Sequence, residues 1–313
     1  MWSYVTRRIL ATIPVLGVVA VVVFLMLRLS PGDPAAIIAG DSATLDDIAM
    51  IREQLGLDRP LLQQFVLWVL QLLGGDLGNS IYLSRPVLGL ILERVEPTLA
   101  LALTTMVFAM LLAIPTGVLA AWRAGSWVDQ TIMALSVLAF SVPVFLIGYG
   151  LVIGLSLELE WLPVQGFVSI WEDPWRFASH LVLPTLTLGL VYTALLARIT
   201  RATMLETLNE DFIRTARAKG LGEPRVLLLH ALKSASVPIV TTIGTGLALL
   251  IGGVVVTESV FAIPGIGRLT IEAVLQRDYP IIQGVILVIA AVYVLVNLVI
   301  DLAYPLLDPR IRF

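Results

Sequence analysis

The residues that could do chemistry are few in this chain of 313 residues, and their spacing excludes several familiar kinds of active site. There is no cysteine, so thiol nucleophiles, disulfides and cysteine metal sites are excluded. The two histidines, His180 and His230, are too far apart in sequence to suggest a histidine metal cluster. No G-x-S-x-G or H-E-x-x-H pattern occurs, and neither lysine stands in the G-x-x-x-x-G-K-[ST] arrangement that cradles phosphate. We therefore predict that the chain is not an enzyme and holds no metal or cofactor of its own.

Ionisable and small residues within apolar segments are the remaining candidates for function. Glu258, Asn297 and Asp301 lie near the ends of such segments, where capping or interhelical hydrogen bonds explain them as well as a functional role does. No carboxylate pair lies at membrane depth, which weighs against an ion-coupled carrier. Glycines in the fifth apolar segment suit either close helix packing or the lining of a wide path. The candidate pathway or gate residues are Pro143, Gly244, Gly252 and Glu258.

The segment 198–237 is the most strongly charged part of the second half of the chain, with lysines and arginines interspersed with acids. Its pattern predicts a short helix from Glu210 to Lys219, closed by Gly220, and another from Arg225 to Ser234. Two interpretations remain open. The segment is either a solvated loop, or a pair of short helices that seats in a partner's cleft and carries force to a helical bundle.

The elements that must position these residues are apolar and long. The chain is 58% hydrophobic and 14% charged, whereas a soluble domain carries roughly 25% charged residues. A net charge of −3 argues against a nucleic-acid partner. We expect kinks or tilts at Pro115 and Pro143, and a snorkelling side chain at Arg198. Six stretches without Asp, Glu, Lys or Arg are long enough to cross a bilayer: Ile9–Leu27, Thr98–Ala121, Thr131–Leu157, Leu181–Ala197, Ile239–Val256 and Ile281–Ile300.

The distribution of lysine and arginine predicts the orientation of these stretches. With the N-terminus inside, the basic residues concentrate in the inner segments, and the first outer segment is rich in acids. The first stretch exceeds a normal signal-peptide core and lacks an Ala-x-Ala cleavage site, so we interpret it as a retained anchor. The fold class is therefore an all-α, multi-pass membrane protein with six transmembrane helices and both termini in the cytoplasm.

The segment 30–97 is too long for a simple connector and predicts a small outer helical subdomain. One helix begins at Leu45 and stops at Gly56, a second covers Leu61 to Leu73, and a third runs from Ser84 to Arg94. The second is too short to span and suits a helix at the membrane interface or packed on the bundle. The subdomain is either a space-filling lid or a docking surface or gate. We thus divide the chain into residues 1–29, 30–97 and 98–313.

Several short motifs are spread over essentially the whole chain. They are Arg28-Leu29-Ser30-Pro31-Gly32-Asp33-Pro34, Gly56-Leu57-Asp58, Gly75-Asp76-Leu77-Gly78, Ser141-Val142-Pro143, Leu183-Pro184, the run Asp211 to Leu221 with His230-Ala231-Leu232, Pro264-Gly265-Ile266-Gly267, Arg277-Asp278-Tyr279-Pro280, Asn297-Leu298-Val299-Ile300-Asp301 and Asp308-Pro309-Arg310. Together these motifs resemble those of bacterial ABC importer permeases of the dipeptide/oligopeptide/nickel group. In the general permease pattern E-A-A-x3-G-x9-I-x-L-P, this chain agrees at Ala216, Gly220 and Leu232.

The resemblance implies a type I importer bundle in the bacterial cytoplasmic (inner) membrane. It implies a second homologous permease, two cytoplasmic ABC ATPase subunits that bind ATP and Mg, and an extracytoplasmic solute-binding protein, all surrounded by membrane lipid. ATP binding would close the ATPases and open the bundle outward. The residues it assigns to the ATPase contact are Glu210, Asp211, Phe212, Arg214, Thr215, Ala216, Arg217, Ala218, Lys219, Gly220 and Leu221.

Alternatives remain open for the identity of the solute and for the class of protein. Di- or oligopeptides are the first choice, and nickel complexes or another small solute fit the same machinery. A secondary transporter or channel subunit that is not coupled to ATPases belongs to another class. A receptor or assembly factor without transport is a third.

Overall fold

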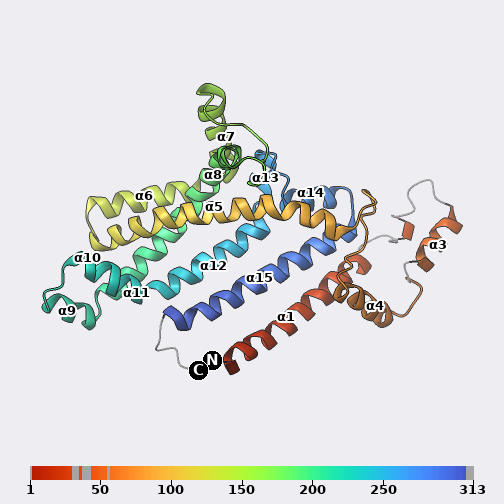
Figure 1. Ribbon diagram of the computed structural model, residues 1–313, viewed down its shortest axis with the longest axis horizontal. Coiled ribbons are helices and arrows are strands. Elements are labelled where there is room, and N and C mark those ends of the chain that lie inside the picture. The colour runs from red at the N-terminus through yellow and green to blue at the C-terminus, as the bar shows by residue number, and fades with distance from the viewer. Residues whose placement is uncertain (1, 30–34, 37–43, 55–56, 308–313) are drawn as a thin grey trace. The chain divides into compact units, whose positions relative to one another are not determined.

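The computed structural model describes residues 2–29, 35–36, 44–54 and 57–307 (Figure 1). Across these ranges the secondary structure is helical, apart from an isolated bridge between Asn79 and Pro86. Of the quoted motifs, residues 30–34, Gly56 and Asp308-Pro309-Arg310 lie outside the described residues. The contacts divide the chain into two compact units: unit 1, of residues 1–5, 95–268 and 295–313, and unit 2, of residues 6–94 and 269–294.

Unit 2 holds the first apolar stretch and the short helices that follow it. Helix α4 keeps the predicted bounds, and Gln64 fixes its entry by donating from Nε2 to the carbonyl oxygen of Arg59 at 2.8 Å. An aromatic cluster joins α4 to α1, because the Phe24 ring lies 5.1 Å from Phe65 and 5.6 Å from Trp68. Helices near the N-terminal end of the chain include α1 (Trp2–Leu29), α3 (Leu45–Gln54) and α4 (Leu61–Leu73).

The third outer helix predicted by the sequence is the first part of a longer one. Helix α5 (Val87–Trp122) begins three residues after Ser84 and continues without a break past Arg94 and Pro97. A proline removes one backbone donor, but the remaining hydrogen bonds of a 36-residue helix hold its course. The predicted end of this helix at Arg94 was therefore wrong.

Unit 1 contains the second, third, fourth and fifth apolar stretches. Local sequence fixes several boundaries: Asp173 caps α8 by accepting from the Trp175 and Arg176 amides at 3.0 Å, and Pro174 follows at the first helical position. As expected, α8 continues past Arg198. The elements are α6 (Trp127–Ser141), α7 (Val144–Leu151), the π-helical η1 (Val152–Glu158), α8 (Pro174–Leu208), α9 (Asp211–Ala218), α10 (Glu223–Arg225), the π-helical η2 (Val226–Ala231), α11 (Leu232–Ser234), α12 (Ser236–Gly253), α13 (Val255–Val260), α14 (Ile266–Leu275) and α15 (Tyr279–Leu307), the last two continuing between the units.

The third stretch is bent far more than the predicted tilt. Helix α6 ends at Ser141, and the next residue, Val142, has the extended ψ of 128° that a following proline favours. The helical segment that begins after Pro143 is bent by 97° from α6. A second bent pair, 223–234 with 236–252, turns by 62°. Among the described residues, four helices are long and apolar enough to cross a membrane, or up to six if each bent pair is one span.

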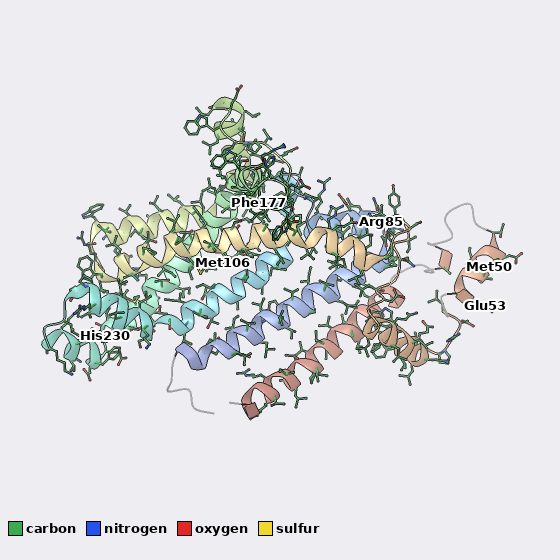
Figure 2. The ribbon with its side chains drawn as sticks, in the orientation of Figure 1. Met50, Glu53, Arg85, Met106, Phe177 and His230 are labelled. Carbon is green, nitrogen blue, oxygen red and sulfur yellow. The ribbon has the colours of Figure 1, made fainter. Side chains whose placement is uncertain are left out.

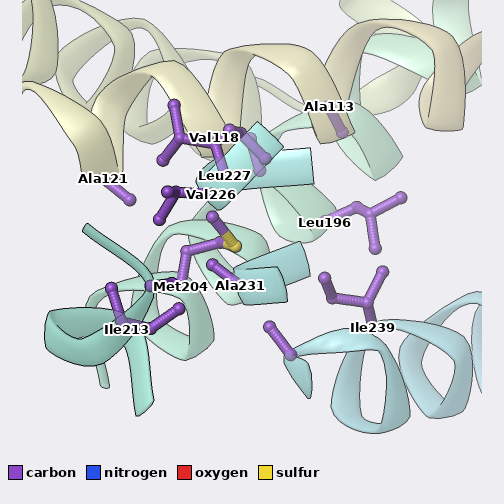
Figure 3. Packing of buried hydrophobic residues seen from close by; sticks show 13 residues of the cluster. Ala113, Val118, Ala121, Leu196, Met204, Ile213, Val226, Leu227, Ala231 and Ile239 are labelled. Carbon is purple, nitrogen blue, oxygen red and sulfur yellow. The ribbon is translucent and has the colours of Figure 1, made fainter. Parts of the chain in front are cut away.

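A buried hydrophobic cluster of unit 1 lies where five elements meet (Figure 3). Helices α5 and α8 contribute small and medium side chains, and α9, η2 and α12 close the cluster from the other side. Its members are Ala113, Val118, Ala121, Leu196, Ala197, Met204, Ile213, Ala216, Val226, Leu227, Ala231, Ala235 and Ile239.

Candidate functional site

Helix α9 lies within the charged segment, and its C-terminal end is set by one glycine. Gly220 has φ +81°, a left-handed conformation that glycine adopts without a Cβ penalty. The Gly220 amide donates to the Arg217 carbonyl at 2.9 Å, and the Leu221 amide donates to the Ala216 carbonyl at 3.4 Å. This pair of bonds is the Schellman arrangement, which satisfies the last carbonyls of the helix. The predicted helix from Glu210 to Lys219, closed by Gly220, is confirmed to within one residue at each end.

The inner face of α9 is anchored in the buried cluster. Ile213 is 0% exposed and Ala216 is 7% exposed, and the spacing of three residues puts both on one side of the helix. Leu221 packs against the same cluster just after the glycine turn. Because Met204 at the end of α8 belongs to this cluster, α9 is held against the end of a membrane-length helix.

The outer face of α9 is polar and charged around one aromatic side chain. Phe212 is 38% exposed, and Thr215 and Lys219 are also exposed. Arg214 pairs with Asp211 on the surface, and Arg217 reaches Glu223 of α10 at 2.8 Å. Exposed ion pairs of this kind contribute little to the stability of the fold, so we interpret these charges as part of a contact surface. An aromatic side chain amid charges is typical of a protein contact.

The second short helix predicted for the segment 198–237 follows α9 directly. The sequence predicted a helix from Arg225 to Ser234, and the structure has helical turns over 223–234, beginning two residues earlier at Glu223. Figure 2 shows His230 at the end of unit 1 that carries α9 to α11. Two short helices with buried inner faces thus connect α8 to α12.

The candidate pathway residues occupy separate places in unit 1. Pro143 lies at the 97° bend between α6 and the helical segment that begins with α7. Gly244 is buried, and a Cβ there would collide with the Ile300 side chain, so its contacts support close packing of α12 on α15. Gly252 is in the last turn of α12 and partly exposed. The structure does not bring these three residues into one site.

Glu258 is fully buried and braces the start of α14. Its Oε1 accepts from the Thr98 hydroxyl at 2.7 Å, and its Oε2 accepts from the Arg268 amide at 2.9 Å. The Thr98 oxygen in turn accepts from the Ile266 amide at 2.8 Å. Gly265 also leaves room for this carboxylate, since a Cβ there would overlap it. These contacts favour the capping interpretation of Glu258, and its role in a pathway remains a prediction.

Sequence reasoning missed an ion pair that joins α6 to α8. Arg201 donates from Nε to Asp129 Oδ1 at 2.5 Å and from Nη2 to Oδ2 at 2.6 Å, and the Asp129 side chain is only 5% exposed. The Gly125 amide adds a third donor at 2.9 Å. The only signal in the sequence was an isolated acid at the start of an apolar stretch. In the part of the chain that the structure describes, no group of acids or histidines could hold a metal ion.

The helical bundle and the pair of short helices between α8 and α12 have a counterpart among solved structures. A chain of the inward-facing MetNI methionine ABC transporter has the same fold, with a TM-score of 0.57 and 18% identity over 70% of this chain and 96% of that chain. The chain belongs to the family described as "Binding-protein-dependent transport system inner membrane component", which matches residues 113–313. The N-terminal family of the same component matches residues 1–114.

Relatives over the full length agree with this assignment. A protein of Sinorhizobium fredii named "Probable peptide ABC transporter permease protein y4tP" is 51% identical over 100% of both chains. The "Glutathione transport system permease protein GsiC" of Escherichia coli K12 is 43% identical, again over 100% of both chains. The chain is thus a multi-pass inner-membrane permease subunit of a bacterial ABC importer.

Proposed function

We propose that this permease imports di- or oligopeptides that an extracytoplasmic binding protein delivers. The names of the relatives support this solute class, because one is a probable peptide permease and glutathione is itself a tripeptide. In the proposal the chain pairs with a homologous permease and two cytoplasmic ABC ATPases in the bacterial cytoplasmic membrane. Both termini lie inside, as the distribution of basic residues indicates.

One observation carries the proposed link to ATP. Helix α9 exposes Phe212 and a set of charges, while Ile213 and Ala216 fix its other face to the end of α8. A short helix with this construction moves as one body with the bundle, so a push on its outer face reaches the membrane. The part of the segment 198–237 that follows α8 is therefore the coupling loop of the proposal, with Glu210 to Leu221 as the ATPase contact.

The roles of the importer's subunits in the proposal follow from the link to ATP. The partner ATPases bind ATP and Mg and hydrolyse the nucleotide, and their closure draws the α9 segments of the two permeases together and opens the bundle outward. The outer segment 30–97 serves in the proposal as part of the dock for the binding protein. Hydrolysis then resets the bundle toward the cytoplasm.

The test is peptide uptake and ATP hydrolysis by the complete importer, reconstituted in proteoliposomes with its binding protein. Gly220→Trp and Arg217→Glu are compared with Gly222→Ala, because Gly222 has an ordinary φ of −65° and a Cβ there meets Pro224 only at 3.9 Å. We expect the first two variants to lose uptake and solute-stimulated hydrolysis, and the Gly222→Ala control to retain both.

Normal coupled hydrolysis in Gly220→Trp and Arg217→Glu would refute the coupling role of α9. Stable co-purification of ATPases without any solute accumulation by the wild-type importer would instead support a receptor. Uptake that persists without ATPase subunits would support a secondary transporter.

A further inference from the structure

Arg198 of α8 is an exposed arginine without a carboxylate partner among the described residues. Its guanidinium carbon lies 5.3 Å from the centre of the Phe140 ring on α6. An arginine over an aromatic face at this distance gains a favourable cation–π interaction. This contact orients the charge but leaves its hydrogen-bond donors available.

The position of Phe140 shows which way the Arg198 side chain points. One turn further along α8, Arg201 is paired with Asp129 in the first turn of α6. Phe140 is eleven residues beyond Asp129, which on an α-helix is a rise of about 16 Å. Arg198 therefore extends away from the end of the bundle that holds the Asp129 pair and toward the bend at Pro143. Side chains on a helix lean toward its N-terminus, so the backbone of α8 favours the same direction.

This direction differs from the snorkelling expected from the sequence. A snorkelling arginine would reach for the nearer, Asp129 end of the bundle, but the guanidinium lies over Phe140 instead. Charged side chains within membrane-spanning segments are costly, and they almost always face a bundle interior or a water-filled path. The exposure of Arg198 therefore fits the wall of an aqueous route better than a lipid-facing surface.

We propose that Arg198, oriented by Phe140, is a recognition point for a carboxylate of the transported solute on the wall of the translocation path. The planar guanidinium matches a carboxylate in a two-bond arrangement, and every peptide with a free C-terminus carries one. Phe140 is three residues before the Pro143 bend, so a change in that bend would move the ring that orients the arginine. The carboxylate part of this inference rests on the proposed peptide import, whereas the aqueous exposure of Arg198 does not.

The aqueous exposure is tested first, and the chain offers a natural background because it has no cysteine. Arg198→Cys is treated in membranes with a water-soluble, membrane-impermeant thiosulfonate reagent applied from each side. Leu111→Cys is the hydrocarbon control, because this leucine is 69% exposed on an apolar face of α5. Arg123→Cys is the matched aqueous control, because Arg123 also stacks on an aromatic ring, Trp122 at 5.2 Å, but lies in the hairpin between α5 and α6.

We expect Cys at position 198 to react within about tenfold of the rate at position 123, since both then face water. A rate as low as that at position 111 would overturn the proposal. The rate does not depend on which solute is carried, so this result is separate from the success or failure of the proposed function.

The carboxylate is tested by uptake of a tripeptide with a free C-terminus and of its C-terminal amide, each supplied at equal occupancy of the binding protein. In Arg198→Gln, uptake of the free acid should fall about tenfold, a loss of about 1.4 kcal/mol, while uptake of the amide should stay within twofold of wild type. Arg198→Lys should recover part of the free-acid uptake. An equal fall for both peptides, or no fall, would refute carboxylate recognition.

A chemical rescue checks that charge is the cause. Uptake of the free acid by Arg198→Cys should recover after modification with an aminoethyl thiosulfonate, which restores a cation, and should stay low after a neutral methyl reagent. Equal recovery with both reagents would contradict the proposal. If the wild-type importer takes up neither peptide, the proposed solute class fails, and the labelling result still stands.

Discussion

Arg201 and Asp129 form a two-bond ion pair, at 2.5 and 2.6 Å, between the end of α8 that leads into α9 and the start of α6. The Asp129 side chain is nearly buried, whereas the Arg201 side chain is 27% exposed. The pair therefore ties the hairpin that follows α5 to the helix on which the coupling loop rests.

Removal of one partner should destabilise the permease more than removal of both. Arg201→Gln leaves Asp129 buried without its partner, which costs on the order of 3 kcal/mol. The double variant Asp129→Asn with Arg201→Gln removes the unpaired charge and should recover most of that loss. Thermal unfolding in detergent measures both effects, and equal midpoints for the single and double variants would contradict the assigned role.

The two faces of α9 should separate stability from coupling. Ile213→Ala removes a fully buried side chain and should lower the free energy of unfolding by about 2–5 kcal/mol. Phe212→Ala, on the exposed face, should leave the unfolding midpoint within a degree or two and weaken ATPase binding. Unfolding scans and co-elution of the ATPases from a sizing column measure the two properties. The opposite assignment of the two effects would mean that α9 is turned the other way.

The bend at Pro143 should persist in solution and depend on the proline. With rises of 1.5 Å per residue, spin labels at Thr131→Cys and Leu157→Cys should lie about 26 Å apart across a 97° bend and about 39 Å apart along a straight helix. Pro143→Ala should shift the distribution toward the longer distance, because the backbone donor returns. Pulsed electron spin resonance on the otherwise cysteine-free chain measures this, and a wild-type distance near 39 Å would refute the bend.

Asp278 should control the order of the loop that precedes α5. Within unit 2 it accepts from the Ser80 hydroxyl at 2.5 Å and from the Tyr82 amide at 3.1 Å, and it is 0% exposed. Asp278→Ala should therefore raise amide hydrogen exchange of residues 80–86 at least tenfold, since each lost bond to a charged group contributes about 1.5–3 kcal/mol. Tyr82→Ala, which keeps the backbone amide and changes an exposed side chain, is the control. Unchanged exchange in Asp278→Ala would contradict the assigned contact.

Much of the fold could be predicted because apolar stretches and helix ends are local signals. The bounds of α4 and the closure of α9 at Gly220 follow from prolines and glycines next to the helix. The 97° bend at Pro143 could not be predicted, because proline permits a range of bends and tertiary packing selects one.

The site was predictable in its position along the chain but not in its contacts. The charge pattern and Gly220 located α9. The burial of Ile213 depends instead on packing against Met204 and η2, which the pattern of charges does not reveal. The Asp129–Arg201 pair and the Glu258–Thr98 bond join residues 72 and 160 positions apart, and single-chain spacing holds no signal for such partners.

The central claim is that the outer face of α9 contacts a cytoplasmic ATPase, and site-specific crosslinking in membranes tests it most directly. A photoreactive amino acid is placed at Phe212 or Ala218 on α9, with Arg123 in the α5–α6 hairpin as the control position. The account predicts a permease–ATPase product from positions 212 and 218, altered in yield by a non-hydrolysable ATP analogue, and none from position 123. No product from either α9 position in an importer that still transports would contradict the account.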